Sequence, residues 1–111
     1  MNSITSNLKR ACAEMFLLRL LHEEDMYGYQ MAQQIKKRTN GRFSILEGSM
    51  YPILTRLLNK GYVTYENRQI TDRLIRVYYH ITDEGKIYYK ELLEIFINDV
   101  EVIKEFMTEG E

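Results

Sequence analysis

The stretch Glu47–Lys60, with the sequence EGSMYPILTRLLNK, predicts the helix around which the rest of the fold is arranged. Pro52 is compatible with this helix, because the carbonyl that its ring would displace belongs to Gly48, at the helix start. The run Asn59-Lys60-Gly61 is typical of a helix end. The apolar stripe of this helix consists of Met50, Leu54, Leu57 and Leu58. The exposed side that remains consists of Ser49, Tyr51, Pro52, Thr55, Arg56 and Asn59.

Two further helices are predicted before this one. Apolar residues at helical spacing cover Leu8–His22, over an arc wider than one buried face requires, so this helix is expected to contact a second partner. A second helix is predicted over Tyr27–Arg38, with Asp25 as a candidate N-cap and three cations in its last turn. The short apolar segment Phe43–Leu46 is predicted as a minor strand.

The chain after residue 61 predicts a hairpin and one long helix. The strands are expected over Tyr62–Glu66 and Leu74–Ile81, with a polar tip over Asn67–Arg73. Thr82 is expected to cap the last helix, in which two acidic residues follow it. The last helix has an apolar seam with alternating steps of four and three residues. The seam consists of Tyr89, Leu93, Phe96, Val100, Ile103 and Met107.

The seam allows two interpretations. The helix either packs on its own domain or associates with a second copy. A helix of roughly 25 residues is about 37 Å long, which is more than one small domain covers on both flanks, so self-association is favoured. The residues expected at the dimer interface are Leu8, Cys12, Met15, Tyr89, Leu93, Phe96, Val100, Ile103 and Met107.

The predicted order of elements is that of a winged helix-turn-helix. The fold class is mainly α with a small β-hairpin: residues 1–81 form a winged helix-turn-helix DNA-binding domain, and residues 82–111 a long C-terminal dimerisation helix. In such a fold the third helix enters the major groove and the hairpin touches phosphates. The residues expected to contact DNA are Lys36, Lys37, Ser49, Tyr51, Pro52, Thr55, Arg56, Lys60, Arg73 and Arg76. Arg38 of the second helix and Arg68 and Gln69 of the hairpin are further candidates on the same elements.

Charge is divided unevenly along the 111 residues. Residues 1–81 hold 12 Lys and Arg against 7 Asp and Glu, a net charge of +5, whereas residues 82–111 hold 3 against 9, a net charge of −6. The total of −1 therefore conceals a basic front, suited to nucleic acid, and an acidic end.

Several other classes are excluded. His22 and His80 have no carboxylate at ligand spacing, and Ser49 lacks the second glycine of a nucleophile elbow, so neither an enzyme, a metal site nor a cofactor is expected. The lone Cys12 excludes an internal disulfide and predicts a buried structural thiol. No membrane span or cleavable leader is expected, and the predicted location is the cytoplasm.

Four ordered motifs resemble the PadR family of bacterial transcriptional regulators. They are Tyr27-Gly28-Tyr29-Gln30-Met31, Glu47-Gly48-Ser49-Met50-Tyr51-Pro52-Ile53-Leu54-Thr55-Arg56-Leu57, Gly61-Tyr62-Val63 and Tyr78-Tyr79-His80-Ile81-Thr82-Asp83-Glu84-Gly85. The resemblance covers nearly the whole chain and is similar to the compact branch with a single C-terminal helix. It implies a homodimer that binds an inverted-repeat operator in double-stranded DNA and represses transcription.

The resemblance also implies that the dimer interface can bind a small apolar or aromatic effector that releases the DNA; the alternative is that the same residues form plain dimer core. The lining would consist of Met15, Leu18, Phe96, Ile97 and Val100. Two features depart from the family pattern: Leu74-Ile75-Arg76-Val77 replaces the usual Gly-Arg pair of the wing, and no tryptophan is present to stack a planar ligand.

Two alternatives stay open at this point. A winged-helix adaptor would use the third helix and hairpin as a protein-docking face and would show a contiguous apolar patch on the third helix. A carrier of apolar ligands would have a roomy interface and no salt-sensitive DNA binding.

Overall fold

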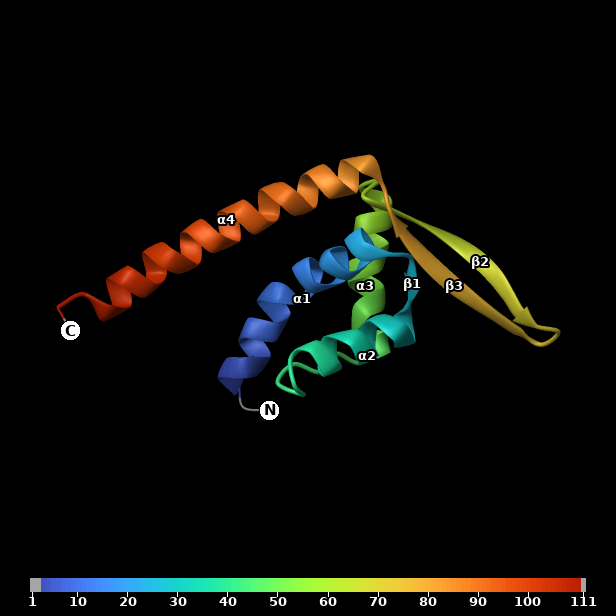
Figure 1. Ribbon diagram of the computed structural model, residues 1–111, viewed down its shortest axis with the longest axis horizontal. Coiled ribbons are helices and arrows are strands. Elements are labelled where there is room, and N and C mark those ends of the chain that lie inside the picture. The colour runs from blue at the N-terminus through green and yellow to red at the C-terminus, as the bar shows by residue number, and fades with distance from the viewer. Residues whose placement is uncertain (1–2, 111) are drawn as a thin grey trace.

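The computed structural model describes residues 3–110, which form four helices and a small antiparallel sheet (Figure 1). The elongated molecule measures 63 × 31 × 21 Å, because the last helix and the hairpin extend from a small helical body in different directions. The predicted winged helix-turn-helix with a long C-terminal helix is confirmed. The elements are α1 (Ser3–Glu23), β1 (Met26–Tyr27), α2 (Gly28–Arg38), α3 (Glu47–Asn59), β2 (Val63–Thr71), β3 (Leu74–Ile81) and α4 (Asp83–Thr108).

The core lies where α1, α2 and α3 meet the base of the hairpin and the first turns of α4. Met50, Leu54 and Leu57 of α3 are fully buried, as the apolar stripe predicted. Two placements from the sequence need correction. Leu18 is 0% exposed inside the chain's own core, so it has no surface for a ligand. Tyr89 is only 8% exposed and belongs to the same core, because the first turns of α4 pack on α1.

The sheet differs from the sequence prediction at both ends. Phe43–Leu46 is not a strand; the third strand is instead β1, whose Met26 and Tyr27 pair with Tyr79 and Tyr78 of β3. The strand order is β1-β3-β2. This two-residue strand forms because it pairs with the edge of β3. A segment of two residues is too short to carry a strand pattern in its own sequence.

The hairpin is longer and its turn tighter than predicted. Strand β2 continues through the polar residues to Thr71, so only Asp72 and Arg73 separate the strands, and the register shifts between Gln69 and Thr71. The predicted tip, residues 67–73, is therefore mostly strand. The hairpin, called the wing below, projects from the body with both faces largely exposed to solvent, so polar residues fit its pleat as well as apolar ones do.

The predicted helix boundaries at α3 and α4 are confirmed. Pro52 lies in the first half of α3 without ending it, and Gly61 takes a φ of +77° just after the helix, a conformation that favours glycine. Thr82 caps α4 by accepting a hydrogen bond from the Gly85 backbone N–H at 3.0 Å. Asp25, by contrast, is not the cap of α2: the residue at that position is Tyr27, with no side-chain cap.

Candidate nucleic-acid interface

The solvent side of α3 is the side that the sequence predicted. All six of its predicted residues are exposed, from Ser49 to Asn59. The Tyr51 hydroxyl donates a hydrogen bond to Glu47 Oε2 at 3.3 Å, and burial together with the nearby Glu47 carboxylate raises the pKa of Tyr51. The N-terminal half of α3 thus presents small polar groups beside one oriented aromatic ring.

A hollow of about 210 Å³ joins the start of α3 to the wing. Its walls come from both elements and from the start of α2, so the exposed face of α3 and the wing form one continuous surface. The hollow is lined by Tyr27, Gly28, Glu47, Tyr51, Ile75, Arg76, Val77 and Tyr79.

Two arginines of the wing lie on tyrosine rings. The guanidinium carbon of Arg76 is 4.5 Å from the ring centre of Tyr27, and that of Arg68 is 4.1 Å from the ring centre of Tyr78. The two rings meet edge to face, with centres 5.3 Å apart. This stacked set orients Arg76 in advance and leaves its charge available, since a cation on an aromatic face remains a cation.

Arg68 is engaged within the chain. Its Nη2 lies 3.0 Å from Asp25 Oδ2 and its Nε 2.9 Å from Glu66 Oε1, and the hydrogen bond to Glu66 is the main reason that the pKa of Arg68 is raised. The other oxygen of Asp25 lies 2.7 Å from His80 Nδ1. Asp25 therefore fastens the α1–α2 connection to the wing, which explains why it does not cap α2.

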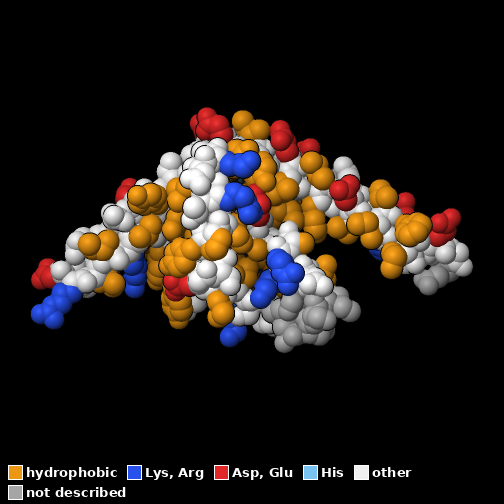
Figure 2. All heavy atoms as spheres, turned by 180° about the vertical axis from the view of Figure 1, so that it is seen from behind, with side chains coloured by type: hydrophobic (Ala, Val, Ile, Leu, Met, Phe, Trp, Pro, Cys, Tyr) orange, Lys and Arg blue, Asp and Glu red, His pale blue; other side chains and the backbone are white. Residues whose placement is uncertain are grey.

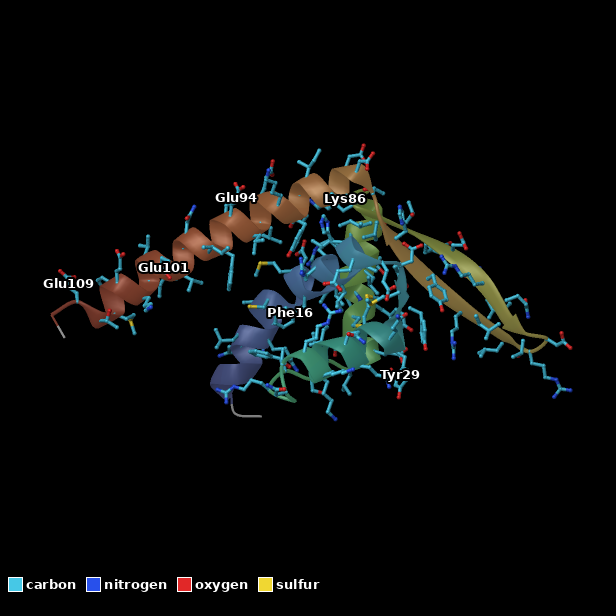
Figure 3. The ribbon with its side chains drawn as sticks, viewed as in Figure 1. Phe16, Tyr29, Lys86, Glu94, Glu101 and Glu109 are labelled. Atoms are coloured by element: carbon cyan, nitrogen blue, oxygen red, sulfur yellow. The ribbon has the colours of Figure 1, made fainter. Side chains whose placement is uncertain are left out.

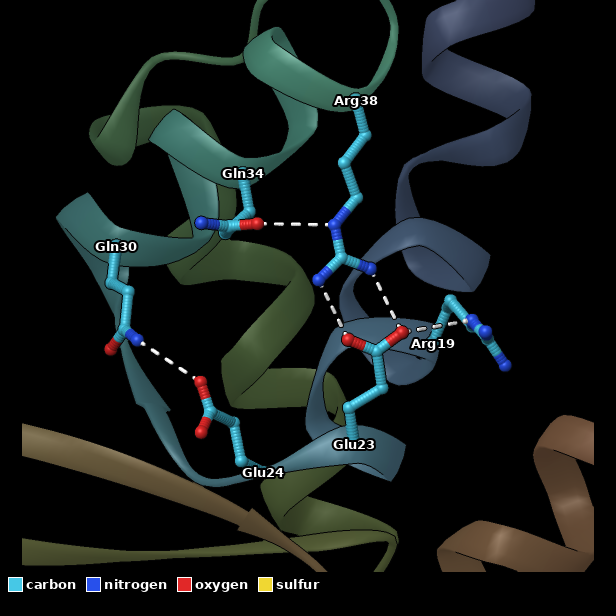
Figure 4. A network of polar contacts seen from close by, with 6 residues as sticks. All are labelled: Arg19, Glu23, Glu24, Gln30, Gln34 and Arg38. Carbon is cyan, nitrogen blue, oxygen red and sulfur yellow. Dashed lines mark hydrogen bonds and ion pairs between the residues drawn. The ribbon is translucent and has the colours of Figure 1, made fainter.

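The cations at the end of α2 also fall into two groups, one paired within the chain and one exposed. Arg38 donates two hydrogen bonds to Glu23 of α1, at 2.8 and 2.7 Å, and a third to Gln34 at 3.0 Å (Figure 4). This bidentate pair lowers the pKa of Glu23. Lys36 and Lys37 are exposed and border an open hollow of about 790 Å³ between α2 and the loop that follows it. Unlike Arg38, neither lysine forms an ion pair within residues 3–110.

The wing tip carries Arg73, which is exposed at the turn and forms no ion pair within residues 3–110. Figure 2 shows basic side chains at this far end of the wing. The side-chain amide of Gln69 is occupied, since it donates to the Thr71 carbonyl across the register shift. Lys60 is exposed just beyond α3.

Arg56 differs from what the sequence indicated. Its Nη2 lies 2.8 Å from Glu14 Oε2 of α1, and the second oxygen of Glu14 accepts a hydrogen bond of 2.6 Å from the Tyr88 hydroxyl of α4. The guanidinium is therefore held towards α1 and α4. Glu14 was missed by sequence reasoning, because a lone acid within an apolar helix, 42 residues before Arg56, has no local signal.

A second surface, made by α4, is apolar. Figure 2 shows hydrophobic side chains along the length of this helix, and Figure 3 places Glu94 and Glu101 on the same helix, with Glu109 just after its end. Leu8 of α1 is exposed, whereas Cys12 and Met15 are half-buried, and burial raises the pKa of the Cys12 thiol. The exposed apolar residues of α4 are Ile87, Ile95, Phe96, Ile97, Val100, Val102, Ile103, Phe106 and Met107.

Neither a metal-binding cluster nor a membrane-spanning helix is present among the described residues. Across residues 3–110, no group of three or more His, Cys, Asp or Glu side chains is placed to hold a metal ion. None of the helices in this range is both long and apolar enough to cross a membrane.

Comparison with known proteins identifies close similarities over most of the chain. The model of the transcriptional regulator PadR-like family matches residues 17–91. An uncharacterised protein X of Lysinibacillus sphaericus is 36% identical over 104 residues, which cover 94% of this chain and 95% of that protein. A transcriptional regulator structure from Clostridium thermocellum has a TM-score of 0.83 and 32% identity, covering 96% of this chain and 97% of that one. The structure of Bacillus subtilis PadR in complex with operator DNA has a TM-score of 0.67 and 25% identity, covering 73% and 47%.

Proposed function

Because the chain belongs to the PadR-like family of transcriptional regulators, which are not enzymes, we propose that it is a homodimeric repressor that binds an inverted-repeat operator. Its proposed location is the cytoplasm, where bacterial DNA lies. We keep the division of the chain at residues 81 and 82, with the winged helix-turn-helix reading DNA and α4 holding the dimer together.

The observation that carries the proposal is the continuous surface formed by the start of α3 and the wing. The exposed Lys36 and Lys37 at the end of α2 border a separate open hollow. Short polar side chains on α3 can approach base edges, and the cations around them can meet the flanking phosphates. The proposed base-facing residues are Ser49, Tyr51, Pro52 and Thr55. The proposed phosphate-facing residues are Lys36, Lys37, Lys60, Arg73 and Arg76.

The adaptor alternative is weaker, because α3 does not present a contiguous apolar patch. Within the described chain, the only large hydrophobic residue exposed on α3 itself is Tyr51, and its ring is oriented by Glu47. The remaining exposed side chains of the helix are short, polar or charged. Such a face is better suited to the polar base edges of a DNA groove than to the apolar surface of a partner protein.

The dimer is supported by the outer half of α4. Beyond Leu93 the apolar residues of this helix are exposed, whereas the corresponding residues nearer its start pack against the body. A second copy supplies a matching face for Phe96, Val100, Ile103 and Met107. Leu8, Cys12, Met15 and Leu93 border the same side as proposed interface residues, and Tyr89 supports them from within the core.

A ligand that releases the DNA is a further part of the proposal. A pocket between two copies would be lined by Met15, Phe96, Ile97 and Val100, without Leu18, which is buried. Half-exposed aliphatic and aromatic side chains of this kind suit a small aromatic molecule.

The charge division fits this arrangement. In a dimer the regions up to and beyond residue 81 carry +10 and −12, from +5 and −6 in each chain, and they lie on separate parts of an elongated molecule. The basic region meets DNA, while repulsion keeps the acidic helices away from phosphates.

The deciding experiment is selection of bound fragments from genomic DNA, followed by a salt titration on the selected site. We expect an inverted repeat and a log–log slope of about −9 if the five phosphate-facing cations of each chain all act. The double variant Lys36→Gln/Lys37→Gln should reduce the slope by about 4 per dimer. The matched control Lys86→Gln/Lys90→Gln removes the same charge from α4 and should leave the slope unchanged. Failure of the unaltered protein to bind DNA at low salt would contradict the proposed function.

A further inference from the structure

One carboxylate joins the reading helix to both helices of the proposed dimer face. Glu14 of α1 accepts Arg56 Nη2 on one oxygen at 2.8 Å and the Tyr88 hydroxyl on the other at 2.6 Å. The Glu14 side chain is only 21% exposed, so these bonds are partly shielded from water. Arg56 stands in the last turn of α3, and Tyr88 stands two turns into α4.

The base of α4 is fixed to the end of α3 by a second set of contacts. The ring of Tyr88 stacks on that of Tyr62, with centres 4.2 Å apart and planes 7° from parallel. Gly85 packs against the Tyr62 backbone carbonyl, and Thr82 Oγ1 donates to the Gly61 carbonyl at 2.7 Å. Together with Glu14, these contacts leave the first turns of α4 little freedom relative to α3.

The length of α4 converts a small change at this joint into a large displacement. Its 26 residues span about 39 Å, so a rotation of about 5° at the base moves the far end by about 3.4 Å. That displacement equals about one base-pair step along DNA. Because the two copies of the proposed dimer meet along α4, the angle between α3 and α4 determines how far apart the two reading helices lie.

We propose that Glu14 is a positioning residue for operator recognition: by holding Arg56 of α3 and Tyr88 of α4, it sets the spacing between half-sites that the dimer accepts. The inference rests on the proposed function. Glu14 itself does not contact DNA, and Arg56 acts as its partner on α3.

The experiment compares operators that differ only in the distance between half-sites. The unaltered protein and three variants are titrated against the selected operator, against versions with one base pair added or removed at the centre, and against a single half-site. Tyr88→Phe keeps the ring stacked on Tyr62 and removes the hydroxyl. Glu14→Gln keeps one acceptor and removes the charge. Glu101→Gln is the matched control, because it removes an exposed charge from α4 away from the joint.

We expect the unaltered protein and the control to prefer the natural spacing by at least tenfold over either altered spacing. In Tyr88→Phe and Glu14→Gln that preference should fall at least fivefold, while affinity for the single half-site stays within twofold. The preference for spacing is the decisive quantity, because a loss of stability alone weakens binding to every operator by the same factor.

The outcomes separate this inference from the proposed function. If the unaltered protein binds no operator, the proposed function fails. If it binds and both variants keep the natural spacing preference, Glu14 is a stabilising residue only and the inference is overturned. Thermal melts identify a variant that has lost its fold, and the conservative Tyr88→Phe substitution keeps the test decisive in that case.

Discussion

Gly85, in the first turn of α4, lies against the backbone carbonyl of Tyr62 with no space for a side chain between them. A methyl group at Gly85 would overlap the carbonyl oxygen and also press on the Ile81 side chain. The contact brings α4 closer to the end of α3 than any residue with a Cβ would allow.

The first prediction follows from that contact. Gly85→Ala should lower the free energy of unfolding by about 2 kcal/mol, because backbone, unlike a flexible side chain, cannot move aside cheaply. Gly48→Ala is the control: a Cβ at Gly48 meets nothing within 4 Å, and alanine favours the helix by about 0.5–1 kcal/mol. Urea unfolding measures both. If the two substitutions changed the free energy of unfolding equally, the contact between Gly85 and Tyr62 would relax more easily than its geometry indicates.

Tyr88 should make stability depend on alkaline pH. Burial, reinforced by the hydrogen bond to Glu14, raises the pKa of Tyr88 to about 12 in the folded chain, against about 10 when unfolded. Its contribution is therefore complete below pH 10 and is lost as the pH rises towards 12. The difference in urea midpoint between the unaltered protein and Tyr88→Phe should shrink over that range. A difference that stays constant over this range would contradict the assignment.

Glu23 should make stability depend on pH in the acid range. Its contribution is lost as the pH falls, whereas that of Tyr88 is lost as the pH rises. The hydrogen bonds from Arg38 lower the pKa of Glu23 from its usual 4.5, so the stabilisation is present above pH 4.5 and is lost as the pH falls through the lower, folded-state value. Because solvent screens this pair, Glu23→Gln should cost about 0.5 kcal/mol at pH 7 and nothing at pH 2. Glu94→Gln, at an exposed position without an ion-pair partner among the described residues, should show no such difference.

The two wing arginines Arg73 and Arg68 should behave differently towards DNA. Arg73→Ala should reduce the salt slope of operator binding by about 2 per dimer, because each chain loses one phosphate contact. Arg68→Ala should leave the slope unchanged, since its guanidinium is already paired with Asp25 and Glu66. A fall in slope in Arg68→Ala would mean that these ion pairs open on DNA.

The apolar seam of α4 should decide the oligomeric state. Val100→Asp places a charge at the centre of the proposed interface and should shift the molecular mass in light scattering from two chains towards one. Ile87→Asp places the same charge on another side of the helix, at an exposed position, and should leave the mass unchanged. A monomeric unaltered protein would contradict the dimer proposal directly.

The elements with strong periodicity were predictable from the sequence. The buried stripe of α3 and the long helix α4 rest on apolar spacing that repeats over several turns, so the sequence predicted both helices correctly. The dimer contact along the α4 seam stays a prediction. The cap at Thr82 was predictable for a similar reason, because a hydroxyl followed by two acids is a strong local signal.

What escaped prediction depends on partners far apart in the chain. Strand β1 exists only through β3, and Asp25 binds Arg68 and His80 instead of capping the adjacent helix. The exposed position of Arg56 was foreseen, but the direction of its side chain was not, since it depends on Glu14 in another helix. Local patterns indicate which residues lie on a face, whereas long-range ion pairs decide which of those residues are available.

The bond between Thr82 and Gly61 closes the wing at its base, and the Thr82 backbone N–H strengthens the closure by donating to the Tyr62 carbonyl at 3.0 Å. The two ends of the wing are therefore held together at its base, independently of the residues between them. Its tip can lengthen, shorten or change its residues in the course of evolution without displacing the helices on either side. In this architecture the wing tip can vary while α3 and α4 keep their places.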